Sequence, residues 1–577
     1  MKEDLTRQLT VALRSLLDDA GDTGEAPVVV LEVPRQAEHG DFACNVAMGL
    51  SKRLGRKPRD IAEDLRVRLG DAGGLIEAAE IAGPGFLNFR LEKSNWQDLV
   101  REIMRAGPAF GRSEIGAGAR VQVEFVSANP TGPLSTGHGR QAVLGDCIAR
   151  LLDHVGYAVT REYYFNDGGR QMRVLGESVK ARYLELLGRA APPDPGALAD
   201  PARDWPAEID GLPVAFPRDG YQGDYIRDIA QSLLDARGEA LVDVPGDGEF
   251  REAAQKAIFA EINSTLDSIG IHFDVHSNEK ALFDDGLVDR VVADLRAREL
   301  VYENEGALWL AATRFGLERD RVVIKSSGEA TYLLPDIAYH REKLRRGFEL
   351  VVDVQGADHI EQFPFVRATM DALGLDGTKI ELVMHQFVTI TSGGEKVKQS
   401  TRKATFITVD ELVQQVGADV FRFFMIERKP EGHLDFDLDL ARDRNWRKNP
   451  AYYVQYAHAR THGIERRALA EGLSMPGPDD LDAARLALPE EIELVRKLGE
   501  FPETVRRAAE AREPHHVAYY LRDLAGLWNP YLQDGEHHRV ISEDSDLTAA
   551  RLGLVLAMRY VLAAGLDLLG VSAPEQM

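Results

Sequence analysis

Cysteine is scarce in this chain of 577 residues, which contains only Cys44 and Cys147. Two thiols cannot build a disulfide framework or a four-thiolate zinc site. No stretch of about eighteen apolar residues occurs, so no membrane-spanning helix is predicted. The start, Met-Lys-Glu-Asp-Leu, is too acidic for a signal peptide. Together these absences predict a reduced, cytoplasmic protein that binds no membrane.

Basic residues are also fewer than acidic ones. The chain has 69 Lys and Arg and 93 Asp and Glu, which gives a formal net charge of −24. This deficit argues against nonspecific coating of nucleic acid, although it leaves room for a local basic groove. Apolar residues make up 44% and charged residues 28% of the chain, as in folded soluble proteins. At about 150 residues per domain, the length predicts three or four domains.

The first hundred residues mix helical and strand patterns. Apolar residues at helical spacing predict a helix over residues 1–19, and the apolar run at 28–31 predicts a strand. Residues 42–70 have a largely helical pattern, and 81–91, with Gly-Pro-Gly inside, predict a bent strand. We therefore expect a small α+β domain over residues 1–105.

Strand and helix patterns alternate through the middle of the chain. A strand pattern at 121–126 is followed by a helix pattern at 139–154 and a strand pattern at 157–164, which together make a βαβ unit. Later strand patterns lie at 308–313, 322–324, 350–354 and 380–384. This alternation predicts a doubly wound parallel sheet of the Rossmann-like α/β class.

Two further segments complete the predicted organisation. A stretch rich in Pro, Asp and Gly at about 190–222 predicts a surface insertion in the α/β domain. From residue 440 to 577 no strand pattern remains, so we expect an all-α domain there.

The loop over residues 127–140 joins the first strand of the βαβ unit to its helix. Gly137 and Gly139 would let a phosphate approach the backbone closely. The N–H groups at the start of the helix would face such an anion with the positive end of the helix dipole. His138 lies at that end and could donate to a phosphate whose charge grows during displacement.

Two polar residues, Glu124 and Asn129, flank the end of the same strand and could hold a cationic group. A Pro/Gly turn with a surface histidine is the simpler explanation of the segment. The loop contains neither Gly-x-Gly-x-x-Gly nor Gly-x-x-x-x-Gly-Lys-Ser/Thr, so a nicotinamide site and a P-loop lack support.

The segment 129–138, Asn-Pro-Thr-Gly-Pro-Leu-Ser-Thr-Gly-His, resembles the His-Ile-Gly-His region of class I aminoacyl-tRNA synthetases, in the form found in arginyl-tRNA synthetases. The resemblance continues through 139–146 and 161–171. Ser135 stands where the family has its first histidine, and a hydroxyl has a shorter reach and carries no charge. His138 would therefore do more of the work.

A second loop, at residues 395–404, follows two glycines that could act as a hinge. Its four basic residues could fold over a triphosphate and stabilise the leaving pyrophosphate. Taken alone, the segment would be a solvated basic loop. It resembles the family's Lys-Met-Ser-Lys-Ser loop, in which Lys398 and Ser400 match and Gln399 replaces the methionine.

Tyr332 and Asp336 are four residues apart, so they would share one face of a helical turn. A carboxylate beside a phenol ring suits a guanidinium, and the resemblance favours an arginine pocket over an ordinary helix start with Asp336 exposed. After the strand pattern that follows, Gly356, Asp358 and His359 are expected to touch adenosine. A metal is the alternative, but no second cluster of ligands has metal spacing.

In the C-terminal region, four basic residues at 442–448 precede the segment 449–460, which contains three tyrosines and Arg460. This mixture suits single-stranded RNA, because rings stack on splayed bases while cations meet phosphates. Tyrosines that pack between helices are the alternative. The tail at 565–577 resembles the family's C-terminus, and segments 39–45 and 82–89 resemble the N-terminal domain peculiar to arginyl enzymes.

The resemblance covers nearly the whole chain. It implies a class I synthetase catalytic domain at 119–435, an N-terminal domain at 1–105 that contacts the tRNA elbow, and an anticodon-binding domain at 440–577. The implied activity is that of an arginine–tRNA ligase, which activates L-arginine with ATP and Mg²⁺ and loads tRNA(Arg). The implied enzyme is a cytoplasmic monomer that uses no zinc, no other resident metal and no organic cofactor.

The resemblance also implies roles for particular residues. The implied catalytic residues are Ser135, His138, Lys398 and Ser400. The implied arginine site contains Glu124, Ser127, Asn129, Tyr332 and Asp336. The implied ATP site contains Gly137, His138, Gly356, Asp358, His359 and Lys398. The implied tRNA contacts are Tyr453, Gln455, Tyr456, Arg460 and Met577.

Two other functions stay open at this point. One is a tRNA-binding paralogue that charges nothing, supported by Ser135 and Gln399 in the signature loops and opposed by the presence of His138, Lys398 and Asp336. The other is a paralogue that makes arginyl-adenylate but passes it to a small acceptor. The long helical C-terminal domain argues against this second alternative.

Overall fold

The computed structural model describes every residue except 35, 37–38, 195–205, 358–359, 398–406 and 536. The described chain forms two compact units. Unit 1 comprises Met1–Phe110, Arg460–Glu500 and Gly526–Val561, and unit 2 comprises Gly111–Ala459, Phe501–Ala525 and Leu562–Met577. Three long helices contribute residues to both units: α17 (Pro450–Ala470), α20 (His515–Tyr531) and α21 (Ser545–Leu568).

Unit 1 begins with the predicted small α+β fold. The first helix buries Leu5, Leu9, Leu13 and Leu16 along one face, as its helical spacing predicted. The sheet is antiparallel with strand order β1-β3-β2. The elements are α1 (Lys2–Asp19), β1 (Phe42–Cys44), α2 (Val46–Leu54), α3 (Pro58–Leu69), β2 (Ile76–Ala82), β3 (Phe86–Leu91) and α4 (Lys93–Ala106).

Two strand predictions in this region are wrong. Residues 81–91 are not one bent strand, because β2 and β3 form a hairpin whose turn contains Gly83 and Gly85, both with positive φ. Residues 28–31 form no strand. An isolated bridge joins Glu32 to Ala43, and alternation of buried and exposed valines alone does not make a ladder.

The later residues of unit 1 pack against α4. The helix α18 (Pro489–Gly499) lies beside it, and Gln97 donates to the carbonyl of Leu486 at 3.0 Å. Arg496 Nε lies 2.9 Å from Asp41 Oδ1. The unit is therefore built from segments far apart in the sequence.

Unit 2 contains a five-stranded parallel sheet with strand order β13-β12-β4-β5-β8. Strand β4 is followed by helix α5 (Thr136–His154), as the βαβ pattern predicted. The strands are β4 (Arg120–Glu124), β5 (Ala158–Phe165), β8 (Val275–Asn278), β12 (Leu350–Gly356) and β13 (Ile380–His385).

The order of these strands creates a switch point between β4 and β12. From β4 the chain proceeds to β5 and β8 on one side, whereas β12 and β13 lie on the other side. Connections from two adjacent strands therefore leave in opposite directions, which opens a crevice at their carboxyl ends. A ligand site is expected at that edge.

Two predicted strands do not belong to the parallel sheet. The patterns at 308–313 and 322–324 form β10 (Ala307–Leu310) and β11 (Arg321–Ile324), which join β9 (Val301–Asn304) in a separate antiparallel sheet. The fifth parallel strand is instead β8, which is short and mostly polar. Periodicity shows a strand but not its neighbours, so the sequence could not assign these strands to sheets.

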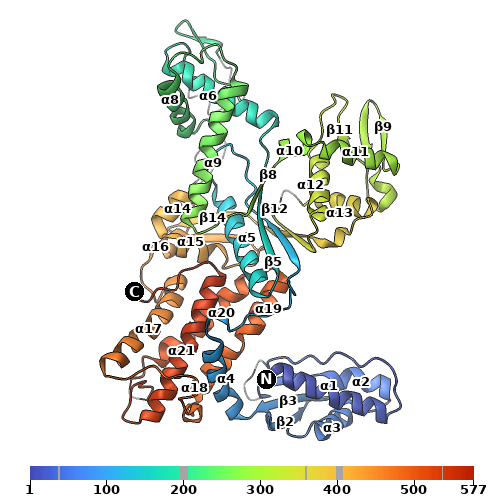
Figure 1. Cartoon of the computed structure of the whole chain (residues 1–577), viewed down its shortest axis with the longest axis vertical. Coiled ribbons are helices and arrows are strands. Elements are labelled where there is room, and N and C mark those ends of the chain that lie inside the picture. The colour runs from blue at the N-terminus through green and yellow to red at the C-terminus, as the bar shows by residue number, and fades with distance from the viewer. Residues whose placement is uncertain (35, 37–38, 195–205, 358–359, 398–406, 536) are drawn as a thin grey trace. The chain divides into compact units, whose positions relative to one another are not determined.

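The remaining elements of unit 2 are mostly helices. Helices α6, α8 and α9 pack together, as do α12 and α13 (Figure 1). The helices are α6 (Gly169–Leu186), α8 (Asp224–Arg237), α9 (Arg251–Ser268), α10 (Glu279–Asp284), α11 (Leu287–Ala297), α12 (Leu333–Arg345), α13 (Phe363–Ala372), α14 (Val409–Val416), α15 (Ala418–Met425), α16 (Leu438–Arg442) and α19 (Phe501–Ala511). The short strands are β6 (Glu208–Ile209), β7 (Leu212–Pro213), β14 (Val388–Ser392), β15 (Glu395–Lys396) and β16 (Leu434–Asp437).

Helix α21 is long and apolar enough to cross a membrane by length and composition alone. Its mean hydropathy is 1.5, but 67% of that apolar stretch is buried within the protein. Burial on this scale is typical of the core helix of a helical domain. The predicted absence of strands after residue 440 is confirmed among the described residues.

Candidate functional site

The carboxyl end of β4 turns sharply into the predicted phosphate loop. Val126 and Ser127 have φ of 65° and 40°, values that residues with side chains rarely adopt. Ser127 Oγ donates to Glu124 Oε1 at 2.8 Å and accepts from the backbone N–H of Tyr164 at 3.3 Å. The turn therefore aligns Glu124 and Ser127 beside β5, at the switch point.

Ser135 and His138 meet at the first turn of α5. Ser135 is the N-cap of the helix, and its Oγ lies 3.2 Å from His138 Nδ1. The backbone N–H of Ser135 donates to the same Nδ1 at 3.3 Å. Ser135 thus orients the His138 ring and satisfies the start of the helix.

The glycines of this loop differ in what they do. A Cβ on Gly137 would meet only Ser135 Oγ, at 3.7 Å, so this backbone is open to a ligand. A Cβ on Gly139 would lie 2.7 Å from Phe421, so this glycine serves close packing. Gly139 is therefore required for packing, and Gly137 has open space beside its backbone.

Asp336 lies in the first turn of α12 and is largely buried. Its pKa is raised to about 7, chiefly by burial and also by the charges of Glu124 and Glu279, while His340 and Lys343 act in the opposite direction. The alternative of an exposed Asp336 is therefore wrong. Three carboxylates converge here, which suits a cationic ligand.

Tyr332 does not share the environment of Asp336. Helix α12 begins at Leu333, so Tyr332 stands just before it, with 69% of its surface exposed. The backbone N–H of Asp336 nevertheless donates to the carbonyl of Tyr332 at 3.3 Å, so the two residues are one helical turn apart, as their spacing predicted.

Glu279 is a site residue that the sequence reasoning missed. It follows β8 directly, accepts from Asn166 Nδ2 at 2.8 Å and from Tyr164 Oη at 3.3 Å, and its pKa is raised by burial. An acidic residue at the end of a parallel strand is the signal that could have found it, but β8 was not recognised as a strand.

One face of α12 carries a buried polar network beneath the site. Lys343 Nζ contacts Glu124 and lies 2.7 Å from Asp353 Oδ1 on β12. His340 Nε2 lies 2.6 Å from Asp353 Oδ2. Lys343 and His340 lower the pKa of Asp353 despite its burial, so we assign it as a carboxylate.

The other predicted ligand contacts lie at the same edge or outside the described residues. Asn129 Oδ1 accepts from the backbone N–H of Asn166 at 3.0 Å, which ties the loop to the end of β5. Gly356 is the last residue of β12. Four predicted residues lie outside the described part of the chain: Asp358, His359, Lys398 and Ser400.

The predicted aromatic tRNA contacts gather around a residue that the sequence reasoning did not include. Trp446 stacks on Tyr456 and Tyr453, with ring centroids 4.1 and 6.0 Å away. The guanidinium of Arg447 lies over Trp446, 4.7 Å from the ring centroid. Met577 is 58% exposed. Stacked rings beside a cation are what splayed bases bind.

Two other predicted tRNA residues have their polar groups inside the fold. Gln455 is buried, and its Nε2 donates to Asp419 Oδ2 at 2.8 Å and to the carbonyl of Ser572 at 3.0 Å. Arg460 donates to the carbonyls of Asn529 and Leu532, each at 2.9 Å. Gln455 therefore anchors the C-terminal tail.

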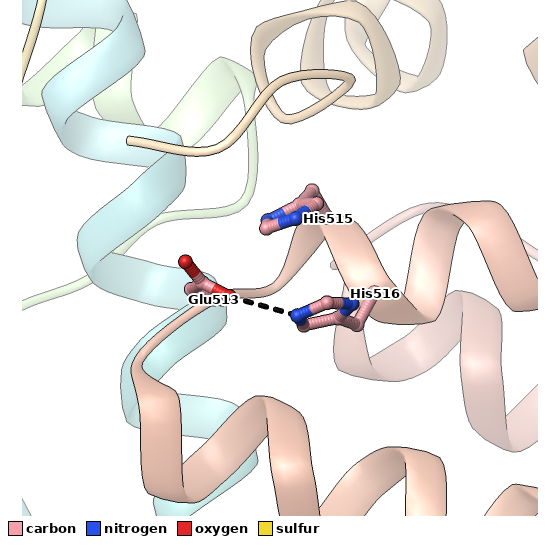
Figure 2. A group of neighbouring side chains, drawn as sticks. All are labelled: Glu513, His515 and His516. Atoms are coloured by element: carbon pink, nitrogen blue, oxygen red, sulfur yellow. Dashed lines mark hydrogen bonds and ion pairs between the residues drawn. The ribbon is translucent and has the colours of Figure 1, made fainter. Parts of the chain in front are cut away.

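One group of side chains has the geometry of a metal site that the spacing of ligands along the sequence did not predict. Figure 2 shows Glu513, His515 and His516, whose ligand atoms all lie within 4.8 Å of one another. His516 Nε2 already bonds Glu513 Oε2 at 2.7 Å, and burial lowers the pKa of His515. A cation here would face the positive end of α20, with the opposite charges of Glu431 and Lys429 nearby. The group shares no residue with the carboxyl edge of the sheet.

Three protein families match the chain. Residues 103–190 and 235–429 match "tRNA synthetases class I (R), catalytic domain", residues 3–91 match "Arginyl tRNA synthetase N terminal domain", and residues 454–577 match "DALR anticodon binding domain". The parallel sheet, its capped helix α5 and these matches define a class I aminoacyl-tRNA synthetase.

Relatives narrow the assignment within that class. The chain is 47% identical to an arginine–tRNA ligase of Desulfotalea psychrophila, over 95% of this chain and 94% of the relative, and 47% identical to one of Salinibacter ruber, over 99% of each. The structure of Thermus thermophilus arginyl-tRNA synthetase is similar at 26% identity, with a TM-score of 0.75 and complete coverage of both chains. The chain belongs to the arginine–tRNA ligase family, which confirms the resemblance and the predicted fold class.

Proposed function

We propose that the carboxyl edge of the parallel sheet activates L-arginine with ATP and that the chain then loads it onto tRNA(Arg). The observation that carries this proposal is the convergence of Glu124, Asp336 and Glu279 beside the capped start of α5. A carboxylate-lined pocket next to a helix N-terminus pairs a cation site with an anion site. The curated relatives are arginine–tRNA ligases, which supports the same function.

Arginine is held by the carboxylates and the β4 loop. Asp336 and Glu279 take the guanidinium, because burial and acidic neighbours raise the pKa of each carboxyl and neither has a cation in direct contact among the described ion pairs. Glu124 and Ser127, with Asn129, hold the amino-acid end. Tyr332, one helical turn before Asp336, provides a ring for the guanidinium.

ATP lies against the start of α5 and the end of β12. His138, oriented by Ser135, donates to phosphate oxygens, and the open backbone at Gly137 lets them approach. Gly356 faces the adenosine. By family resemblance, Asp358 and His359 contribute to this site, Lys398 and Ser400 act on the phosphates, and Mg²⁺ accompanies the nucleotide.

The chemistry needs positioning and charge stabilisation rather than a covalent enzyme intermediate. A carboxylate oxygen of arginine attacks the α-phosphorus, a new C–O–P bond forms, and pyrophosphate leaves with the electrons of the broken P–O bond. The donors at the start of α5 stabilise the charge that grows on phosphate. A hydroxyl of the tRNA's terminal adenosine then attacks the carbonyl carbon, giving the ester and AMP.

Recognition of tRNA uses both ends of the chain. Residues 1–105 act as the elbow-contacting domain, 119–435 as the catalytic domain and 440–577 as the anticodon-binding domain, where Tyr453, Tyr456 and Met577 meet the RNA. The enzyme works as a cytoplasmic monomer, off the membrane, with no zinc and no organic cofactor.

The direct test is ATP–pyrophosphate exchange with arginine, measured with and without tRNA(Arg). We expect exchange in the presence of tRNA and its loss in His138→Ala, with Arg341→Met as a control on the distant side of α12. Exchange that needs no tRNA would favour an enzyme that serves another acceptor. Absence of exchange with tRNA still bound would favour the non-charging paralogue.

A further inference from the structure

Lys343 is a fully buried lysine of α12, with 0% of its side chain exposed. Its ammonium contacts Glu124 of β4 and lies 2.7 Å from Asp353 Oδ1 of β12. These two strands flank the switch point where the site opens. A buried ammonium is tolerated only where its partners compensate for lost hydration, so Lys343 binds α12 to both strands.

Two other residues on the same face of α12 attach the helix to strand β5. Tyr339 Oη donates to Glu162 Oε1 of β5 at 2.8 Å, and Arg346 Nη1 lies 2.8 Å from Glu162 Oε2. The side chains at 339, 343 and 346 are three or four residues apart, so they share a face. Asp336 lies one turn earlier on this helix, so its place over the crevice follows from the same contacts.

Lys343 also supplies positive charge to a crowded group of carboxylates. Asp336 is faced by Glu124 from β4, by Glu279 from α10, and by His340 and Lys343 from its own helix. The two carboxylates raise the pKa of Asp336 and the two cations lower it, while burial raises it most. Removing the lysine charge would leave Asp336 harder to ionise.

We propose that Lys343 is a positioning residue of the arginine site, which aligns Glu124 with α12 and keeps Asp336 available as a carboxylate for the guanidinium. The proposal rests on the function proposed above, in which Asp336 binds arginine. Lys343 acts through these acids, because its ammonium is enclosed by Glu124, Asp353 and the ring of Tyr339, whose centroid is 4.3 Å away.

The test is the pH dependence of the KM for arginine in tRNA-supported ATP–pyrophosphate exchange, for the wild type and Lys343→Gln. Glutamine can still donate to both carboxylates but carries no charge. If the pKa of Asp336 rises by about one unit, the arginine KM rises about tenfold on the acid side and returns towards the wild-type value by about pH 9. The KM for ATP should not change.

Arg341→Met is the matched control, because Arg341 is a buried cation on the same helix that pairs with Asp294 of α11. The proposal is overturned if the control gives the same pH-dependent change, or if Lys343→Gln raises the arginine KM equally at every pH. If Lys343→Gln does not fold, the same measurement is made on Lys343→Arg. This variant retains the positive charge, so the proposal requires a wild-type pH dependence of the arginine KM, and a changed dependence would overturn it. Asp336→Asn distinguishes failure of the Lys343 proposal from failure of the proposed arginine site. An unchanged arginine KM in that variant would refute the arginine pocket itself.

Discussion

Replacing Asp336 by asparagine should stabilise the empty protein while weakening its function. The pKa of Asp336 is raised from 3.8 to about 7, so the folded state holds a proton that the unfolded state releases. Stability is therefore lost as the pH rises from 3.8 to about 7, and the loss is complete above that range. At 1.36 kcal/mol per pKa unit, with allowance for partial exposure, the loss is about 2–4 kcal/mol.

Asparagine does not ionise, so Asp336→Asn should not lose folding stability over this pH range. We expect Asp336→Asn to unfold at a higher temperature than the wild type at pH 8 and at nearly the same temperature at pH 4, measured by calorimetry without arginine. The reasoning fails if the variant is no more stable at pH 8, or if its advantage does not shrink on acidification. The control is Asp294→Asn, which removes the carboxylate of α11 that pairs with Arg341 of α12. Its stability relative to the wild type should not increase from pH 4 to pH 8.

The same substitution, Asp336→Asn, should weaken arginine binding although it stabilises the fold. A charge-assisted hydrogen bond contributes about 1.5–3 kcal/mol, so the KM for arginine should rise roughly ten- to hundredfold in Asp336→Asn. In the wild type that KM should fall as pH rises through about 7, because the guanidinium needs the ionised acid. The variant should lose this dependence. An arginine KM that follows pH equally in both proteins would contradict the assignment.

Four other tests address separate parts of the structure. Glu279→Gln should raise the arginine KM about tenfold, by loss of a charged partner, and leave the ATP KM unchanged in the exchange assay. Ser135→Ala should lower stability by about 1 kcal/mol in thermal unfolding and slow exchange, whereas Ser135→Thr, which keeps the cap, should do neither. Gln455→Leu should cost about 1–3 kcal/mol in urea unfolding because it leaves buried acceptors without a donor, and an unchanged midpoint would refute the anchoring role. Treatment with a zinc chelator, followed by restored Mg²⁺, should preserve charging in the wild type and in His516→Gln; lost activity in the wild type would contradict a zinc-free enzyme.

The sequence determined the local features of this protein. Helical spacing in α1, the strand–loop–helix around β4 and α5, and the strand-free C-terminal region could each be predicted, since they depend on neighbours in the chain. The motif ending at His138 indicated the class, and the family comparisons confirmed it.

Tertiary structure decided what sequence spacing could not. The placement of β10 and β11 outside the parallel sheet depends on pairing between distant strands, and the recruitment of Glu279 depends on β8 lying beside β5. Gly139 and Gln455 are residue types that suit ligand contact, yet Phe421 gives Gly139 a packing role and Asp419 gives Gln455 an anchoring role. A residue's type and spacing limit its chemistry, but burial and long-range partners select which part of that chemistry the fold uses.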